Sequence, residues 1–402
     1  MRCIGLLGAV LEPGKTSPKR SSPGPGRTIT VPMAFDLDSA LADTIRIGAS
    51  DLHLKVPSVP RVRVAGRLMA LPRRDELTPE DTLAVKERVM PSEIKLREYE
   101  QNGSSDFSFF NGSGRFRVSA FSQRGSASLV FRVVPSAPEA EELGLPPTVM
   151  SWADAMRGLV VVTGPTGSGK TTTCAALLDR INRTRACHVL TIEDPIEFLH
   201  PDRMAMVCQR EIGLDAPSYH VALRAAMRQD PDVIMIGEVR DEETAMTALR
   251  AAETGHLVIC TMHTIDAVET VQRFVDFFGE RRAPQARQML ASTLVGVVSQ
   301  RLIPTALDSM TLNAEILVNS SRARDLIAVA GSTSELHDAI KEGGYYGMCT
   351  FDQSLLELVA SGVVTEAQAI DFATDGHDFR LALSQAPLPL ESRTAAGLRE
   401  HA

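Results

Sequence analysis

Hydrophobic patterns typical of short helices and strands begin near residue 34 and continue to residue 134. Apolar residues recur at four-residue spacing from Leu37 to Ile45, which predicts a helix. Strict alternation over residues 51–56 then predicts a strand with one buried face. Thr78 followed by Pro79 is typical of a helix start. Further strands are predicted at 61–64, 106–110, 115–121 and 128–133, so residues 34–134 are expected to form a small α+β domain.

After residue 150 the pattern changes to short β-branched runs that alternate with helical stretches. These runs lie at 159–163, 189–192, 233–236 and 257–261. Such alternation predicts a mostly parallel sheet with helices on both faces. From about Pro304 onward the pattern is helical. We therefore expect an α/β domain over residues 150–383, joined to the first domain by a Pro-, Ala- and Glu-rich linker at 135–149.

The two ends of the chain lack this patterning. Residues 1–33 contain five Gly, five Pro and three Ser, a composition that cannot bury enough apolar surface to order itself. We predict a disordered leader over residues 1–33 and a flexible tail over residues 384–402.

Composition narrows the possible partners. The chain has 42 Lys and Arg against 50 Asp and Glu, a net charge of −8, which argues against a nucleic-acid partner. Aromatic residues make up only 5% and Trp152 is the sole tryptophan, so stacking platforms for bases are also disfavoured. The sequence has no run of 18 apolar residues, so we expect no membrane span. Its six cysteines form no CxxC pair, which argues against a structural zinc site.

A phosphate-binding motif follows the strand predicted at 159–163. The segment fits GxxxxGK[ST] and precedes a helix-forming stretch, as a P-loop requires. Glycines let successive backbone N–H groups point at phosphate oxygens, and the helix N-terminus adds a favourable dipole. The lysine is expected to contact the β- and γ-phosphates, and the final threonine hydroxyl to hold Mg²⁺. The predicted nucleotide-binding residues are Gly164, Pro165, Thr166, Gly167, Ser168, Gly169, Lys170 and Thr171.

Acidic residues follow two other predicted strands. Glu238 ends one strand, where a carboxylate can hold the metal or its waters. Glu193, Asp194 and Glu197 follow another, and one of them is expected to orient the water that hydrolyses the nucleotide. His263 follows the last strand and is a candidate γ-phosphate contact. Any one of these acidic residues is as often a solvated loop charge as a catalytic group. The prediction therefore depends on all of them together.

Several longer segments together resemble one family. TGPTGSGKTTT, TIEDPIEF, DPDVIMIGEVRDEETAMTALRAAETGHLV and TMHT are similar to the type II/IV secretion ATPases, and within them to the type IV pilus retraction ATPase (PilT) group. GASDLHL near the start and GMCTFDQSL near the end also resemble that group's motifs. The resemblance runs from about residue 34 to residue 375.

The resemblance implies a PAS-like N-terminal α+β domain, followed by a RecA-like P-loop NTPase domain with a helical C-terminal part. It implies a hexameric ATPase that uses ATP and Mg²⁺ to power pilus retraction. The motor would lie in the cytoplasm, associated with the inner membrane through a platform protein and acting indirectly on pilin. Glu197 would position the attacking water, Glu238 would be the Walker B carboxylate, and His263 would belong to the His box. Arg117 and Arg132 are the candidate arginines that contact nucleotide from the N-terminal domain.

One segment departs from the family pattern. Retraction ATPases carry a helix motif that reads AIRNLIRE, and the matching segment here is RARDLIAV at residues 322–329. Asp325 replaces the motif's Asn, and its terminal charged pair is absent. Coupling to retraction is therefore less firmly implied than ATP hydrolysis. An accessory or regulatory nucleotide-binding subunit of a pilus or type II secretion system is the alternative. A nucleic-acid motor is disfavoured by the charge, and an extension ATPase by the missing tetracysteine motif.

Overall fold

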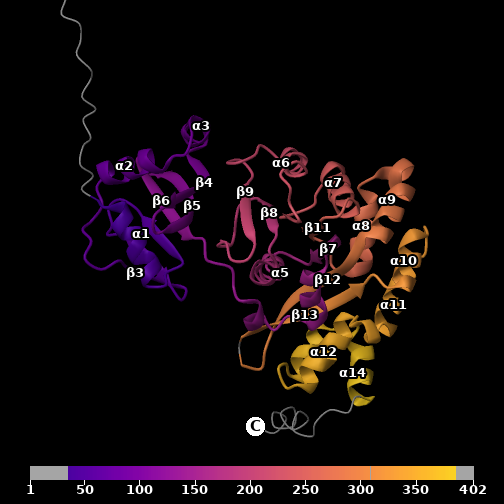
Figure 1. Cartoon of the computed structure of the whole chain (residues 1–402). Coiled ribbons are helices and arrows are strands. Elements are labelled where there is room, and N and C mark those ends of the chain that lie inside the picture. The colour runs from indigo at the N-terminus through magenta and orange to yellow at the C-terminus, as the bar shows by residue number, and fades with distance from the viewer. Residues whose placement is uncertain (1–34, 308, 386–402) are drawn as a thin grey trace, which may run out of the picture.

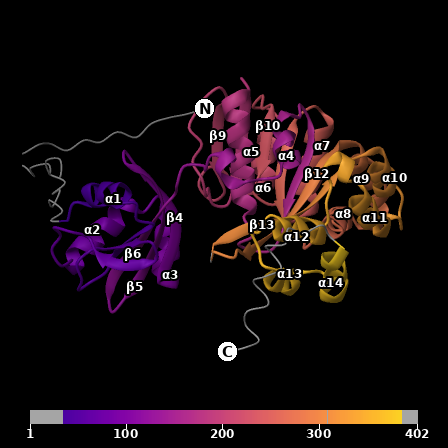
Figure 2. The same ribbon diagram turned by 90° about the horizontal axis from the view of Figure 1, so that it is seen from below.

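The computed structural model describes residues 35–307 and 309–385, which build two lobes that stand side by side (Figures 1 and 2). The N-terminal lobe is built on a six-stranded antiparallel sheet of order β3-β2-β1-β6-β5-β4. The C-terminal lobe is built on a seven-stranded mixed sheet of order β13-β12-β7-β11-β10-β8-β9.

The N-terminal elements agree with the sequence pattern except at one helix. Thr78 caps its helix in a reciprocal capping box with Asp81, as the Thr-Pro start predicts. The helix around Tyr99 was not predicted, because Tyr99 is its only buried residue and leaves no apolar periodicity. The strands are β1 (Asp51–Leu54), β2 (Arg61–Val64), β3 (Arg67–Ala70), β4 (Ser104–Asn111), β5 (Gly114–Gln123) and β6 (Ser126–Val133). The helices are α1 (Leu37–Arg46), α2 (Pro79–Val89) and α3 (Glu93–Asn102).

Alternation along these strands separates a packed face from a polar face. Leu52, Val118 and Phe131 share one face and form a core with residues from α1 and α2. Phe131 meets Phe116 edge to face, with ring centroids 6.3 Å apart. The opposite face carries charged residues, because successive side chains of a strand point to alternate faces of the sheet.

The four strands predicted for the C-terminal domain are confirmed as parallel neighbours. They are β7 (Gly158–Thr163), β8 (His188–Glu193), β10 (Val233–Ile236) and β11 (Leu257–Met262). The expectation of purely helical structure after Pro304 was wrong. The strand β12 (Leu294–Pro304) pairs there with β13 (Met310–Val318). In β13, apolar Leu312, Ala314 and Ile316 alternate with polar Asn313 and Glu315, a strand pattern that the helical prediction overlooked. The edge strand β9 (Met206–Glu211) was also missed.

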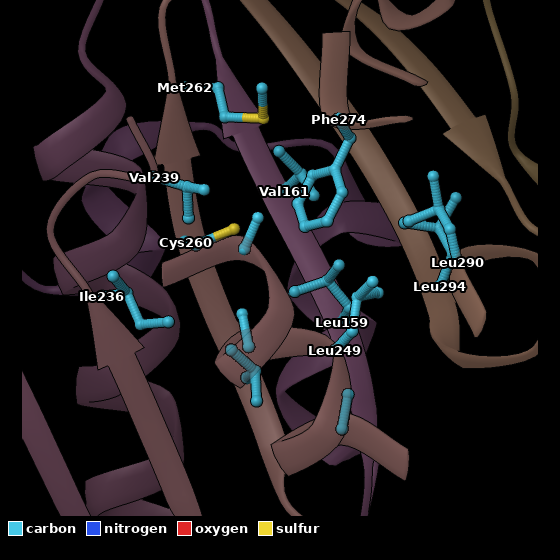
Figure 3. Packing of buried hydrophobic residues seen from close by; sticks show 14 of the residues in the cluster. Leu159, Val161, Ile236, Val239, Leu249, Cys260, Met262, Phe274, Leu290 and Leu294 are labelled. Atoms are coloured by element: carbon cyan, nitrogen blue, oxygen red, sulfur yellow. The ribbon is translucent and has the colours of Figure 1, made fainter. Parts of the chain in front are cut away.

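Helices cover both faces of this sheet, as the alternating pattern predicts. On one face Leu159 and Val161 of β7 meet Phe274 and Leu290 (Figure 3). On the other face Val160 and its even-numbered neighbours pack against α5. The helices are α4 (Pro147–Ser151), α5 (Lys170–Thr184), α6 (Tyr219–Ala226), α7 (Glu242–Glu253), α8 (Ala267–Asp276) and α9 (Gly279–Thr293).

Five further helices follow β13. They are α10 (Ser321–Ala328), α11 (Leu336–Glu342), α12 (Phe351–Ala360), α13 (Glu366–Phe372) and α14 (Gly376–Gln385). The last three form a small core of their own around Ile303 of β12, with Leu355 and Phe379. Across residues 35–307 and 309–385, every helix is too short or too polar to cross a membrane.

The predicted leader, residues 1–33, lies outside the described residues. The predicted tail from residue 384 overlaps the end of α14 at Gln385, and its remainder also lies outside them. Between the lobes, residues 135–149 include a short 3₁₀ helix, Ala140–Leu143, and the start of α4.

Gly296 of β12 provides a test of this packing. A Cβ at this position would lie 2.4 Å from Cζ2 of Trp152 and 2.8 Å from the Leu317 carbonyl oxygen. Gly296→Ala is therefore expected to lower the free energy of unfolding by about 1–3 kcal/mol through overpacking. Urea denaturation followed by Trp152 fluorescence measures this directly. The control Gly344→Ala, whose Cβ meets nothing within 4 Å, should leave the midpoint unchanged; equal midpoints for all three proteins would contradict the prediction.

Candidate nucleotide-binding and catalytic site

A cavity of about 620 Å³ opens at the carboxyl ends of the parallel strands. Neighbouring parallel strands end at one edge of a sheet, so the loops that follow them converge there. The side chains predicted from separate sequence segments therefore meet in one place. The cavity lining includes Thr166, Gly167, Gly169, Lys170, Thr171, Glu193, Asp194, Glu197, Glu238 and His263.

The predicted P-loop connects β7 directly to α5. Gly164 has φ +142°, and a Cβ there would lie 2.4 Å from the Gln300 carbonyl oxygen. Gly169, immediately before the helix, has φ +89°. Both positions require glycine, which explains how the chain turns from a buried strand into the helix. Gly164 and the predicted residues Pro165 and Ser168 belong to this loop but do not line the cavity.

Lys170 rests on its own loop. Its Nζ donates hydrogen bonds of 2.9 Å to the carbonyl oxygens of Gly164 and Pro165, and it lies 3.5 Å from His263 Nδ1. Burial lowers the pKa of Lys170, and the nearby Glu238 carboxylate opposes that shift. The ammonium group is thus held by two loop carbonyls and the His263 ring, at the wall of the cavity.

Glu238 stands two residues beyond the end of β10, after Gly237. Its Oε2 lies 2.6 Å from an Arg240 guanidinium nitrogen and 3.4 Å from His263 Nε2. Burial alone would raise the pKa of Glu238, but its contacts with Arg240 and His263 outweigh burial and lower it. Glu238 is therefore ionised at neutral pH. Lys170 and Glu238 contact opposite nitrogens of His263, an arrangement that the Nε2–H tautomer satisfies.

The three clustered carboxylates occupy different environments. Glu193, the last residue of β8, is buried and accepts hydrogen bonds from Thr191 Oγ1 at 2.6 Å and Gln209 Nε2 at 3.1 Å. Burial raises the pKa of Glu193, and these hydrogen bonds offset only part of that effect. Asp194 and Glu197 are exposed to the cavity. Of the three, these two have exposed side chains, whereas Glu193 lines the cavity as a buried residue.

The two predicted arginines lie on the polar face of the N-terminal sheet, outside the lining of this cavity. Arg117 and Arg132 stand opposite each other on β5 and β6. Arg132 Nε donates a 2.8 Å hydrogen bond to the buried carboxylate of Asp51. Burial would raise the pKa of Asp51, but hydrogen bonds from Arg132 and Ser50 outweigh it and lower the pKa. Within one chain, these arginines therefore do not meet the P-loop.

No sequence pattern predicted a buried carboxylate that joins the two lobes. Glu211, the last residue of β9, accepts hydrogen bonds from Arg115 at 2.8 Å and Ser108 Oγ at 2.6 Å in the N-terminal sheet. It also accepts one from the backbone N–H of Ile196 at 3.1 Å, inside the loop that carries Asp194 and Glu197. One side chain thus connects the N-terminal domain to the acidic loop.

Comparison with known proteins shows which family this chain belongs to. The family described as "Type II/IV secretion system protein" matches residues 29–371. The chain belongs to this family. This secretion ATPase is 41% identical over 349 residues to the type IV pilus retraction ATPase PilT of Pseudomonas aeruginosa, a match that covers 86% of this chain and 100% of that protein. It is 39% identical to the type IV pilus ATPase PilU of the same organism, covering 86% and 91% of the two chains.

A solved structure supports the same relation. The crystal structure of the pilus retraction motor PilT with bound ADP has a TM-score of 0.75 and 42% identity, covering 86% of this secretion ATPase and 98% of that chain. The predicted family, enzyme class and fold class are confirmed. The roles of the individual site residues stay predictions.

The Arg115–Glu211 pair of this secretion ATPase can be tested by a double-mutant cycle. Both side chains are largely buried, 16% and 6% exposed. Arg115→Met and Glu211→Gln, singly and together, are expected to give a coupling free energy of about 1–3 kcal/mol in urea denaturation. The exposed pair Arg97–Glu93, at 70% and 86% exposure, is the matched control. Its coupling should stay below about 0.5 kcal/mol, and equal values for the two pairs would show that the lobes are not joined here.

Proposed function

We propose that this chain is a homohexameric ATP-hydrolysing motor that powers type IV pilus retraction. The observation that carries the proposal is one cavity in which a P-loop lysine, an ionised strand-end carboxylate and two exposed acidic residues converge. The match to a retraction ATPase over that protein's whole length supports the assignment to pili.

Nucleotide binding follows from the position of Lys170. Within the part of the chain that the structure describes, its ammonium group is held by two loop carbonyls and one imidazole nitrogen. The β- and γ-phosphates of ATP offer charged acceptors, which form stronger hydrogen bonds than neutral carbonyls. We infer that Lys170 exchanges these partners for phosphate oxygens when ATP enters, while the loop N–H groups and the N-terminus of α5 hold the remaining phosphate charge.

The residues present fit an ATP-bound Mg²⁺. Within residues 35–307 and 309–385, no group of three or more His, Cys, Asp and Glu side chains is placed to hold a metal by itself. Mg²⁺ that arrives with ATP needs only one or two protein ligands, because phosphate oxygens and waters fill the rest. The Thr171 hydroxyl and the ionised Glu238 would hold it or its waters. When bound, the ion supplies neutralisation of the phosphate charge.

Hydrolysis requires an oriented water more than a strong base. Glu197 is the candidate that orients it, because Glu197 is exposed to the cavity and lies in the loop anchored by Glu211 at Ile196. Asp194 shares this exposure, whereas buried Glu193 fixes the start of the loop. His263, between Lys170 and Glu238, is placed to respond to a γ-phosphate in contact with either residue.

Arg117 and Arg132 would act on a nucleotide held by a neighbouring subunit. They lie on the polar face of the N-terminal sheet, the same face from which Ser108 contacts Glu211, but they do not line the cavity of their own chain. A ring would bring that face to the next subunit's phosphates, where a guanidinium stabilises transition-state charge. Rotation of the two domains during the ATP cycle would then pass motion to an inner-membrane platform protein and return pilin to the membrane. We place the motor in the cytoplasm, attached through that partner.

An accessory or regulatory subunit is the second candidate. It is favoured by α10, the helix at the place of the family's AIRNLIRE motif, which here has Asp325 and ends in Ala328 and Val329. The helix packs on α9 and buries Ala323 and Ile327. Of its changed residues, Asp325 lies on the surface, whereas Ala328 is half-buried against the core. An adaptor would need to bind nucleotide without turning it over.

The enzymatic part of the proposal predicts loss of turnover on removal of one charge. Lys170→Ala is expected to lower ATPase activity by at least about 100-fold, because it removes the main phosphate cation. Phosphate release by the purified wild-type protein and variants, with ATP and Mg²⁺, measures this. Lys341→Ala, a change of the same kind at an exposed position on α11, is the matched control and should keep full activity. Residual activity in Lys170→Ala equal to the control would refute the assignment of the site.

The pilus part is tested by deletion of the gene and imaging of surface pili. Retraction predicts persistent, excess pili, which the wild-type gene restores to normal and the Lys170→Ala gene does not. Loss of pili on deletion would point to extension or secretion. Full complementation by Lys170→Ala would favour the accessory subunit, since that role does not require hydrolysis.

A further inference from the structure

The side chain of Tyr219 reaches the catalytic edge of the sheet from the first turn of α6. Its ring packs against the hydrophobic core on that face of the sheet, and the residue lines the cavity. Its hydroxyl lies over Gly237, since a Cβ at Gly237 would be 2.8 Å from Tyr219 Oη and 3.2 Å from the Ile192 carbonyl oxygen. Only a residue without a side chain leaves room for the hydroxyl between the ends of β8 and β10.

This hydroxyl stands among carboxylates. Burial, reinforced by the negative charge of Asp194 and Glu238, raises the pKa of Tyr219 well above its ordinary value, against the smaller opposing effect of Arg240. The phenol is therefore neutral and carries its proton throughout the working pH range. Among the described residues its hydroxyl makes no hydrogen bond. It is a proton donor directed into a cavity whose other exposed polar groups near it are mainly acceptors.

We propose that Tyr219 is a further catalytic residue of this site, whose hydroxyl donates a hydrogen bond to the water that attacks the γ-phosphate. The inference rests on the proposed ATPase site. A water molecule has two protons and two lone pairs. Carboxylates such as Glu197 can accept from its protons, but only a donor can occupy one lone pair. With that pair held by Tyr219, the remaining lone pair is aimed at phosphorus.

Hydrolysis leaves the tyrosine chemically unchanged. The water oxygen bonds to the γ-phosphorus as the bond from phosphorus to the bridging oxygen of ADP breaks, and a water proton leaves toward Glu197. Tyr219 keeps its proton. A donor on the nucleophile weakens it slightly, but phosphoryl transfer has a loose transition state in which position matters more than nucleophile strength. The net effect of the hydroxyl is therefore acceleration.

The test is Tyr219→Phe, which keeps the ring and removes only the hydroxyl. We expect kcat for ATP hydrolysis to fall about five- to tenfold, as for the loss of one hydrogen bond in the transition state. KM for ATP and the thermal midpoint should stay close to wild type, because neither the phosphate contacts nor the core packing changes. The pH profile should keep its shape, since the phenol does not ionise. Tyr345→Phe, at a tyrosine 94% exposed, is the matched control and should be silent.

The outcomes separate the two levels of inference. Unchanged kcat in Tyr219→Phe, with Lys170→Ala inactive in the same assay, would overturn the role of Tyr219 and leave the ATPase site intact. A raised KM with unchanged kcat would also overturn it, because the hydroxyl would then act in ground-state binding. A wild-type protein that does not hydrolyse ATP under any tested condition would overturn the proposed function together with this inference.

Discussion

The site depends on the burial of three parallel strands along their whole length. Every residue of β7, β10 and β11 is buried, so these strands have no room for charged groups except at their ends. The register aligns Thr163 with Met262 and Ile236 with Ile192. The P-loop, the acidic loop after β8, Glu238 and His263 therefore leave the sheet at one level. The hydrophobic core decides where the polar chemistry must be.

Two buried carboxylates then fix the loop that follows β8. Glu193 holds its start through donors on β8 and β9, and Glu211 holds its middle at the Ile196 N–H. A buried carboxylate without donors is costly, so each must keep its partners. For Glu211, one of those partners is Arg115 of the N-terminal domain. Any domain motion that moves Arg115 thus changes the contacts of Glu211. The orientation of the N-terminal domain is in this way coupled to the position of the acidic loop.

The sequence could predict the elements whose pattern is local. The buried β-branched runs, the Thr78 cap and the P-loop each depend on a few adjacent residues, and all were found. The strand β13 was missed although Leu312, Ala314 and Ile316 alternate there with Asn313 and Glu315. In the edge strand β9, half-buried Gln209 and buried Glu211 depend on tertiary partners, so no local pattern marks the strand. Glu211 and Tyr219 were missed as site residues for the same reason. Their importance arises from neighbours distant in the chain, and no spacing rule reports such contacts.

The polar groups at the strand ends also form a chain of contacts. Lys170 lies beside one nitrogen of His263, Glu238 beside the other, and Arg240 beside Glu238. Glu238 and Arg240 compensate each other's charge directly, and His263 links this pair to Lys170. A triphosphate brings several negative charges to the Lys170 end of this chain, and compensation there must be redistributed toward Glu238 and Arg240. Since Arg240 is 67% exposed, it is the member of the chain that can move away at least cost and free Glu238 for a new cation.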